Sequence, residues 1–229
     1  MNQSIQLTLQ DSAHAHTVWA LSATFDKEER PLRPVTIIEA RGAVEVVFFR
    51  SDSSQLVVAG EDQEAIRNTK TTIDGNKLII KKEDHVRKGR FSWLFRQNRQ
   101  NHRSSRVIVG IALPEVPSLI SVNGSGEMTL YGILQPSLYL SVSGSGAITA
   151  FGQVEDLRAE VGGSGSVNTS ELMTIAAKLS VDGSGSIDAQ GGFNVKAHVA
   201  GSGDIVIRGN PLTRKHSVAG SGEIKFTSK

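Results

Sequence analysis

The sequence predicts an all-β protein in which a β-rich N-terminal region precedes a parallel β-helix. The first observation behind this prediction is the triplet Gly-Ser-Gly, which occurs six times at start-to-start intervals of 18 to 20 residues. A fixed period near twenty residues is typical of stacked repeat folds. The triplets are Gly124–Gly126, Gly144–Gly146, Gly163–Gly165, Gly183–Gly185, Gly201–Gly203 and Gly220–Gly222.

The second observation is that apolar residues keep a constant position around each triplet. A valine lies two residues before every triplet, and a methionine, valine or isoleucine lies two residues after it. Alternation on both sides of a turn indicates two short strands, each with one buried face. The positions before and after each triplet are Val122 and Met128, Val142 and Ile148, Val161 and Val167, Val181 and Ile187, Val199 and Ile205, and Val218 and Ile224.

The third observation is the composition. The 229 residues include 23 glycines, and hydrophobic residues make up 38% of the chain whereas aromatic residues make up only 5%. A core of small aliphatic side chains suits coils that stack at the strand spacing of about 4.8 Å. Glycine suits the corners, because it adopts positive φ readily. We therefore expect about six coils of 18 to 20 residues with the triplets as corners, rather than flexible Gly/Ser linkers.

The region from residue 34 to residue 117 carries strand and turn signals without the repeat. Runs rich in β-branched residues over 35–38, 44–49 and 56–58 predict strands. Residues 61–70 are polar apart from Ala65 and Ile66 and could form one or two helical turns. Asp74-Gly75 between apolar runs predicts a hairpin. Because residues 1–33 are expected to be extended, we divide the chain into residues 1–33, 34–117 and 118–229.

Residues 81–106 interrupt the β pattern with a concentration of positive charge. Nine Lys or Arg residues accompany only Glu83 and Asp84 there, although the whole chain has a net charge of +2. A long basic loop with aromatic residues could dock on an anionic membrane surface. Single-stranded nucleic acid is a less expected partner, and aromatic residues that merely cover a sheet edge are the structural alternative. The candidate binding residues are Arg87, Lys88, Arg90, Phe91, Trp93, Phe95, Arg96, Arg99 and Arg103.

Two carboxylates, Asp204 and Glu223, directly follow the triplets of consecutive repeats. Stacking would bring them about 5 Å apart, near the separation of the catalytic pair in retaining glycosidases. A carbohydrate-active enzyme is therefore an alternative function, although the equivalent positions elsewhere include Glu127, Ala147 and serines, a set typical of solvated corners. The chain has no cysteine and hence no thiolate metal site. We predict neither a metal nor a cofactor.

The β region from Val35 to Ile80, the strand that ends at Leu113-Pro114 and the serial triplets occur in the order of a known family. From about residue 34 onward, the chain resembles the putative auto-transporter adhesin head GIN domain family. The resemblance implies a β-helical domain of bacterial envelope or surface proteins, and it brings no catalytic residues. We therefore predict a non-enzymatic, adhesin-like module that binds a glycan, a protein or a surface through non-repeat residues. A self-assembling β-helix with an open end is a further alternative.

The location of the protein is predicted from the same resemblance. Residues 1–30 lack the basic start and apolar core of a secretory signal. From these residues alone, we expect either a protein that stays inside the cell or one whose signal has been removed. The resemblance favours the cell envelope, in the periplasm or at the surface.

Overall fold

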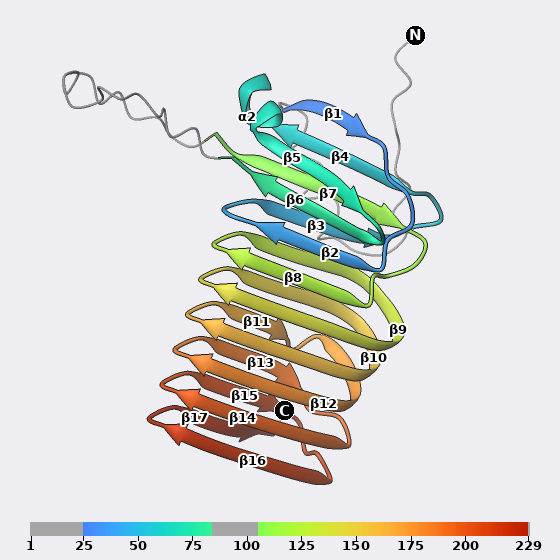
Figure 1. The fold of residues 1–229 in the computed structure, drawn as a ribbon. Helices are drawn as coiled ribbons and strands as arrows, with labels where there is room; N and C mark the ends of the chain where they lie inside the picture. The colour runs from blue at the N-terminus through green and yellow to red at the C-terminus, as the bar shows by residue number, and fades with distance from the viewer. Residues whose placement is uncertain (1–24, 84–104, 229) are drawn as a thin grey trace, which may run out of the picture.

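The computed structural model describes residues 25–83 and 105–228, which form a β-solenoid (Figure 1). Its coils stack along one axis, with the N-terminal strands at one end and the C-terminus at the other. The predicted all-β parallel β-helix is therefore confirmed. The solenoid has about five turns, whereas we expected about six coils.

Two stacks of parallel strands form the main walls of the solenoid. Neighbouring coils pair residue for residue, so that Val161 lies beside Val142 on one side and Val181 on the other. In spatial order, the first stack contains β6 (Lys77–Lys82), β2 (Ile37–Arg41), β8 (Leu119–Gly124), the C-terminal parts of β9 (Glu127–Gly144) and β10 (Ala147–Gly163), β12 (Leu172–Gly183), β14 (Asn194–Gly201) and β16 (Thr213–Gly220).

The second stack lies across the core from the first. In spatial order it contains β7 (Val107–Leu113), β3 (Glu45–Arg50), the N-terminal parts of β9 and β10, β11 (Ser166–Thr169), β13 (Ser186–Gln190), β15 (Asp204–Arg208) and β17 (Glu223–Thr227). The triplets join the first stack to the second, and the chain returns through a bend on the opposite side. Ile133, Val154 and Leu172 are buried at this bend.

Each glycine of a corner has its own physical reason. The first glycine of every triplet has positive φ, as in Gly183 at +123°, which confirms the predicted corner conformation. The third glycine lacks space for a side chain, and it is buried in every triplet except the last, where Gly222 is half-buried. A Cβ on Gly185 would lie 2.5 Å from the Gly165 carbonyl oxygen. The central serine contributes its backbone, because the Ser184 N–H donates to the Gly163 carbonyl oxygen at 2.8 Å.

The valine before each triplet and the apolar residue after it point into one continuous core. From Val122 to Val199, every valine of this set is at most 1% exposed. The last coil differs, since Val218 is 43% exposed. There, the Arg214 guanidinium lies 4.8 Å above the Phe226 ring, and His216 packs on the same ring. These polar side chains cover the C-terminal end of the core.

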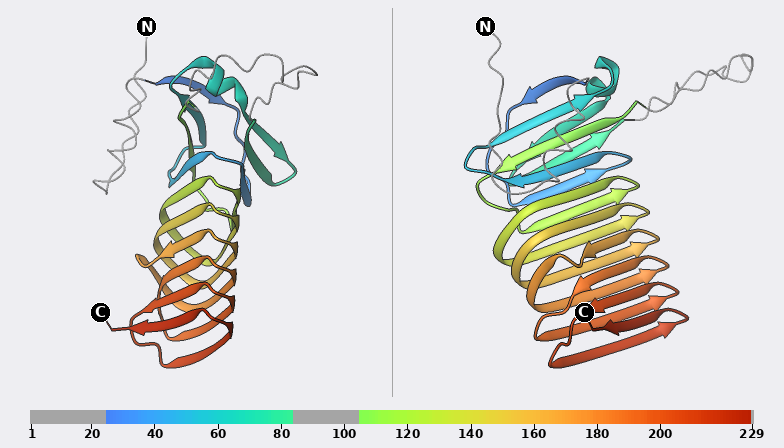
Figure 2. Two further views of the ribbon diagram at one scale, coloured as in Figure 1. Left: turned by 90° about the vertical axis from the view of Figure 1, so that its left-hand side faces the viewer. Right: turned by 180° about the vertical axis from the view of Figure 1, so that it is seen from behind.

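Antiparallel strands cap the N-terminal end (Figure 2). β1 (Asp26–Arg30) pairs with β4 (Gln55–Gly60), and β4 pairs with β7. β5 (Thr69–Asp74) and β6 form the hairpin predicted at Asp74-Gly75. The predicted helical turns are α2 (Gln63–Asn68), whose first turn is capped by the Asp62 carboxylate. The register places β2 and β3 in the same stacks as the repeats, and our division at residues 33 and 117 stays a prediction.

Candidate functional site

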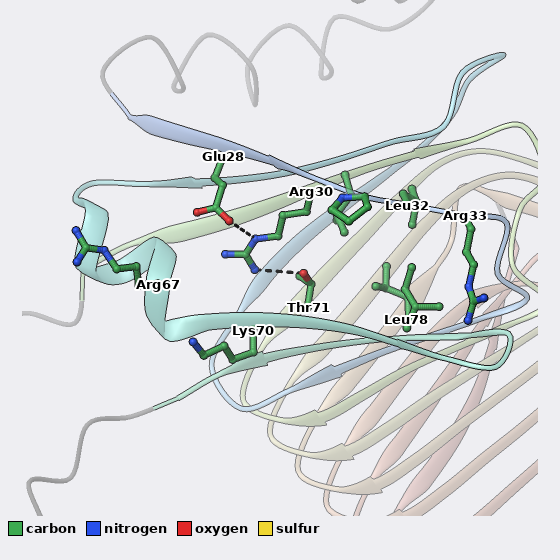
Figure 3. A pocket seen from close by; sticks show the side chains of 11 residues that line it. Glu28, Arg30, Leu32, Arg33, Arg67, Lys70, Thr71 and Leu78 are labelled. Carbon is green, nitrogen blue, oxygen red and sulfur yellow. Dashed lines mark hydrogen bonds and ion pairs between the residues drawn. The ribbon is translucent and has the colours of Figure 1, made fainter.

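A pocket of about 760 Å³ lies in the N-terminal cap, between β1, α2 and the β5–β6 hairpin (Figure 3). Pro31 ends β1, and the segment from Pro31 to Pro34 leads the chain toward β2 along one side of the pocket. All of its lining residues precede the repeats. They are Glu28, Arg30, Pro31, Leu32, Arg33, Leu56, Arg67, Lys70, Thr71, Ile73 and Leu78.

Arg30 holds the pocket walls together. Its guanidinium donates to the Ile66 and Thr69 carbonyl oxygens, at 3.1 and 2.5 Å, and to the Thr71 hydroxyl at 3.2 Å. It also pairs with the Glu28 carboxylate at 2.8 Å, and its side chain is only 13% exposed. Because its donors already have protein acceptors, Arg30 has a structural role that joins β1 to α2 and β5.

The cations available to a ligand lie around the rim. Figure 3 shows Arg67 and Lys70 at the α2 end of the pocket and Arg33 at the opposite end. Arg33 donates to the Gly75 carbonyl oxygen at 3.0 Å. Within residues 25–83 and 105–228, the side chains of Arg67 and Lys70 have no hydrogen bond or ion pair. Two exposed basic groups therefore remain for an acidic partner.

The floor of the pocket is apolar. Leu56 and Leu78 belong to the buried core, and the partly buried Leu32 and Ile73 pack against that core. Ligand sites are usually lined by apolar side chains together with a small number of polar groups. Together with the basic rim, the apolar floor suits a carboxylate, sulfate or phosphate group attached to a less polar body.

A buried carboxylate fastens the cap to the repeats on the outer side of the first stack. Glu39 accepts from Arg41 at 2.6 Å, from Lys77 at 3.0 Å and from the Asn123 amide at 2.7 Å. These partners come from β2, β6 and β8. The hydrogen bond from Arg41 is the largest cause that lowers the pKa of Glu39, to about 2, against the opposing effect of burial. Glu39 therefore has a structural role, because its hydrogen bonds link β2, β6 and β8.

The predicted basic-aromatic site falls outside the described residues, since Arg87 to Arg103 lie within 84–104. The described flanks of the segment are fixed. The Lys82 ammonium donates to the Ser105 carbonyl oxygen at 2.8 Å, and Arg106 makes a bidentate pair with Glu45. The segment thus starts and ends beside β6 and β7, and its binding role stays a prediction.

The predicted acidic pair does stack, because Asp204 and Glu223 are register partners in β15 and β17. Both residues are exposed, and both have structural partners. Asp204 accepts from the Glu223 backbone N–H at 3.0 Å, and the Glu223 carboxylate pairs with Lys225 at 2.7 Å. These contacts stabilise the last coil, whereas a catalytic role for the pair stays a prediction. Over the described ranges, no group of three or more His, Asp or Glu residues could hold a metal ion.

Comparison with known families assigns the fold. The family model described as "Putative auto-transporter adhesin, head GIN domain" matches residues 35–211, which is most of the chain. The chain belongs to this family. The match includes the repeats and the cap strands from β2 onward, so the resemblance predicted from the sequence is confirmed. Comparison with curated proteins finds no match.

Solved structures with the same fold cover nearly the whole solenoid. A "putative adhesin" from Bacteroides fragilis NCTC 9343 is 19% identical, with a TM-score of 0.64 over 90% of this chain and 98% of that chain. A "putative adhesin" from Parabacteroides merdae ATCC 43184 is 14% identical, with a TM-score of 0.59 over 90% and 97%. A "putative lipid binding protein" from Parabacteroides distasonis ATCC 8503 is 18% identical, with a TM-score of 0.53 over 90% and 97%. At these identities the similarity shows the fold alone.

Proposed function

We propose that this GIN-domain chain is a non-enzymatic, adhesin-like module of the bacterial cell envelope or surface. It binds an anionic group of a surface glycan or protein in the cap pocket. The observation that carries this proposal is the meeting of two unpaired basic side chains, Arg67 and Lys70, with an apolar floor. The family and its adhesin-like neighbours support a role in surface binding.

The chemistry of the pocket favours binding over catalysis. Its one lining carboxylate, Glu28, is paired with Arg30, and the Thr71 hydroxyl also contacts that guanidinium. Covalent and acid–base catalysis need a nucleophile or an acid within reach of a suitable partner. The described lining residues include no histidine and no second carboxylate. Charge-assisted hydrogen bonds from the rim would instead fix an anion in place.

An array of acidic glycans, each beside its neutral parent, tests the proposal. We expect the protein to prefer glycans that carry uronate, sialate or sulfate groups. Because hydrogen bonds to charged groups contribute about 1.5–3 kcal/mol, Arg67→Ala/Lys70→Ala should weaken binding at least tenfold. Lys27→Ala is the matched control, since alternation along β1 places Lys27 opposite Glu28 and Arg30. Equal binding of acidic and neutral glycans, or full binding by the double variant, would refute the proposal.

Two further roles rest on residues outside the pocket. The basic residues between 84 and 104 could add contacts with an anionic membrane surface, and their removal in a loop-shortened variant tests that role.

A carbohydrate-active enzyme that uses the stacked carboxylates Asp204 and Glu223 is the alternative function. The observation that favours this alternative is their register in adjacent coils.

The envelope or surface location is likewise part of the proposal. It is supported by the family to which the chain belongs. Helix α2 has 6 residues, and the described residues contain no helix long and apolar enough to cross a membrane. Fractionation of native cells with an antibody against the solenoid tests the location, and recovery solely from the cytosol would refute it.

A further inference from the structure

A patch on the last coils of the solenoid combines exposed apolar and basic side chains. We call it the C-terminal patch and define it as Ile175, Lys178, Phe193, Lys196, Leu212 and Lys215. Its apolar members are 46%, 59% and 81% exposed, at Ile175, Phe193 and Leu212. Large exposed apolar side chains that gather on one side of a soluble domain mark an interaction surface. The patch lies far along the axis from the cap pocket (Figure 1).

The apolar members form a row along the axis, where the chain bends into the first stack. The Phe193 backbone N–H donates to the Ile175 carbonyl oxygen at 2.8 Å, and the Thr213 N–H donates to the Phe193 carbonyl oxygen at 3.0 Å. These bonds join consecutive coils, so Ile175, Phe193 and Leu212 succeed one another at the strand spacing of about 4.8 Å. The solenoid thus presents three apolar side chains in line.

The basic members form a second row beside the first. Lys178 is the register partner of Lys196, and Lys196 is the register partner of Lys215. Each lysine follows an apolar member by three residues in the sequence. Among the residues that the structure describes, the side chains of Lys196 and Lys215 have no ion pair or hydrogen bond, whereas Lys178 interacts electrostatically with Glu160. The three lysines line a groove of about 570 Å³ together with Tyr139, Asp156 and Arg158, and the three apolar members lie outside this groove.

The neighbouring coil shows where the patch ends. The position equivalent to Ile175 is occupied there by the exposed Glu155, and Arg158 is paired with Glu160 at 2.5 Å. The pattern of an exposed apolar residue followed three residues later by an exposed lysine is therefore confined to three consecutive coils. Corner geometry does not require it, because the corners lie at the other end of these strands.

We propose that the C-terminal patch docks the solenoid sideways on an anionic phospholipid bilayer. Aliphatic and aromatic side chains enter the boundary of the acyl chains, and the lysines meet the anionic headgroups. A polar acidic polysaccharide would leave Ile175 and Leu212 without a partner, and a second copy of this face would bring like charges together. The proposal uses a different face from the cap pocket and does not depend on the proposed function.

Sedimentation with vesicles tests the proposal on the full chain. We expect binding to vesicles of phosphatidylcholine with phosphatidylglycerol and little binding to phosphatidylcholine alone. At about 1 kcal/mol for each lysine, Lys196→Gln/Lys215→Gln should weaken binding about thirtyfold. Phe193→Ser/Leu212→Ser should weaken it at least tenfold, because two apolar side chains no longer enter the bilayer. The matched control is Lys27→Gln/Lys81→Gln, which removes two exposed lysines from the cap.

All four substituted patch residues are exposed, so circular dichroism should show unchanged folding, and the two patch variants test the proposal separately. Vesicle binding at wild-type strength in both variants would overturn it, since the membrane contact would then lie elsewhere. Binding of soluble polygalacturonate or DNA through these lysines, without vesicle binding, would also overturn it. So would a concentration-dependent dimer that the Phe193→Ser/Leu212→Ser variant abolishes.

Discussion

Replacement of Gly185 by alanine tests the physical account of the corners. The added Cβ would lie 2.5 Å from both the Gly165 carbonyl oxygen and the Val161 Cγ1 atom. Ordinary contacts of carbon atoms lie near 3.5–4.0 Å, so the coils would have to separate by about 1 Å. The same carbonyl oxygen accepts the Ser186 N–H at 3.0 Å, and such a shift would break this bond.

The expected cost combines overpacking and a lost hydrogen bond. Overpacking contributes about 1–3 kcal/mol and the bond about 1 kcal/mol, so Gly185→Ala should destabilise the protein by about 2–4 kcal/mol. For a chain of this length, that corresponds to a fall in Tm of about 4–16 °C. Thermal unfolding followed by circular dichroism measures it. Ser184→Ala is the matched control and should change Tm by less than about 2 °C, because Ser184 is exposed. Equal Tm values for the two variants would refute the reasoning.

Three further predictions concern charge and the ends of the solenoid. The Glu39 pKa of about 2 lies below the ordinary 4.5, so its stabilisation of about 3 kcal/mol is present above pH 4.5 and is lost as pH falls toward 2. Acid titration of Tm should show a smaller fall for Glu39→Gln than for the wild type, and parallel curves would contradict this. Arg214→Val/His216→Ala restores the residues of the preceding coil, so we expect end-to-end assembly by light scattering; a monomer at high concentration would count against polar capping. Asp204→Ala/Glu223→Ala should leave any release of reducing sugar unchanged, whereas a selective loss would support the glycosidase alternative.

The repeat half of the fold was predictable because one physical constraint recurs in every coil. A side chain at the third glycine of a triplet would overlap the neighbouring backbone, so the corner is visible as an invariant triplet within the chain itself. The stacking of β2 and β3 on the first repeat was not predicted. Their corner at Gly42 lacks the Gly-Ser-Gly sequence. Gly42 nevertheless adopts a positive φ of +80°, as the first glycine of each triplet does.

The candidate sites were less predictable, since they depend on contacts between distant segments. The cap pocket joins Arg30 and Arg33, which lie in the segment that we expected only to be extended, to Arg67 and Lys70 some forty residues later. No local sequence pattern indicates that these four residues line one pocket. The C-terminal patch did carry a signal, because its apolar members each lie eight residues before a triplet and its lysines five residues before. Alignment over the whole repeat, rather than around the triplet, would have shown it.

In our proposal, the triplets build a platform and non-repeat residues bind the partner. Titration of an acidic glycan selected from the array, against three forms of the protein, tests it most directly. We expect wild-type affinity for a variant in which all six corner serines are replaced by alanine, and at least tenfold weaker binding for Arg67→Ala/Lys70→Ala. Binding that survives the pocket substitutions and disappears with the corner serines would contradict the account.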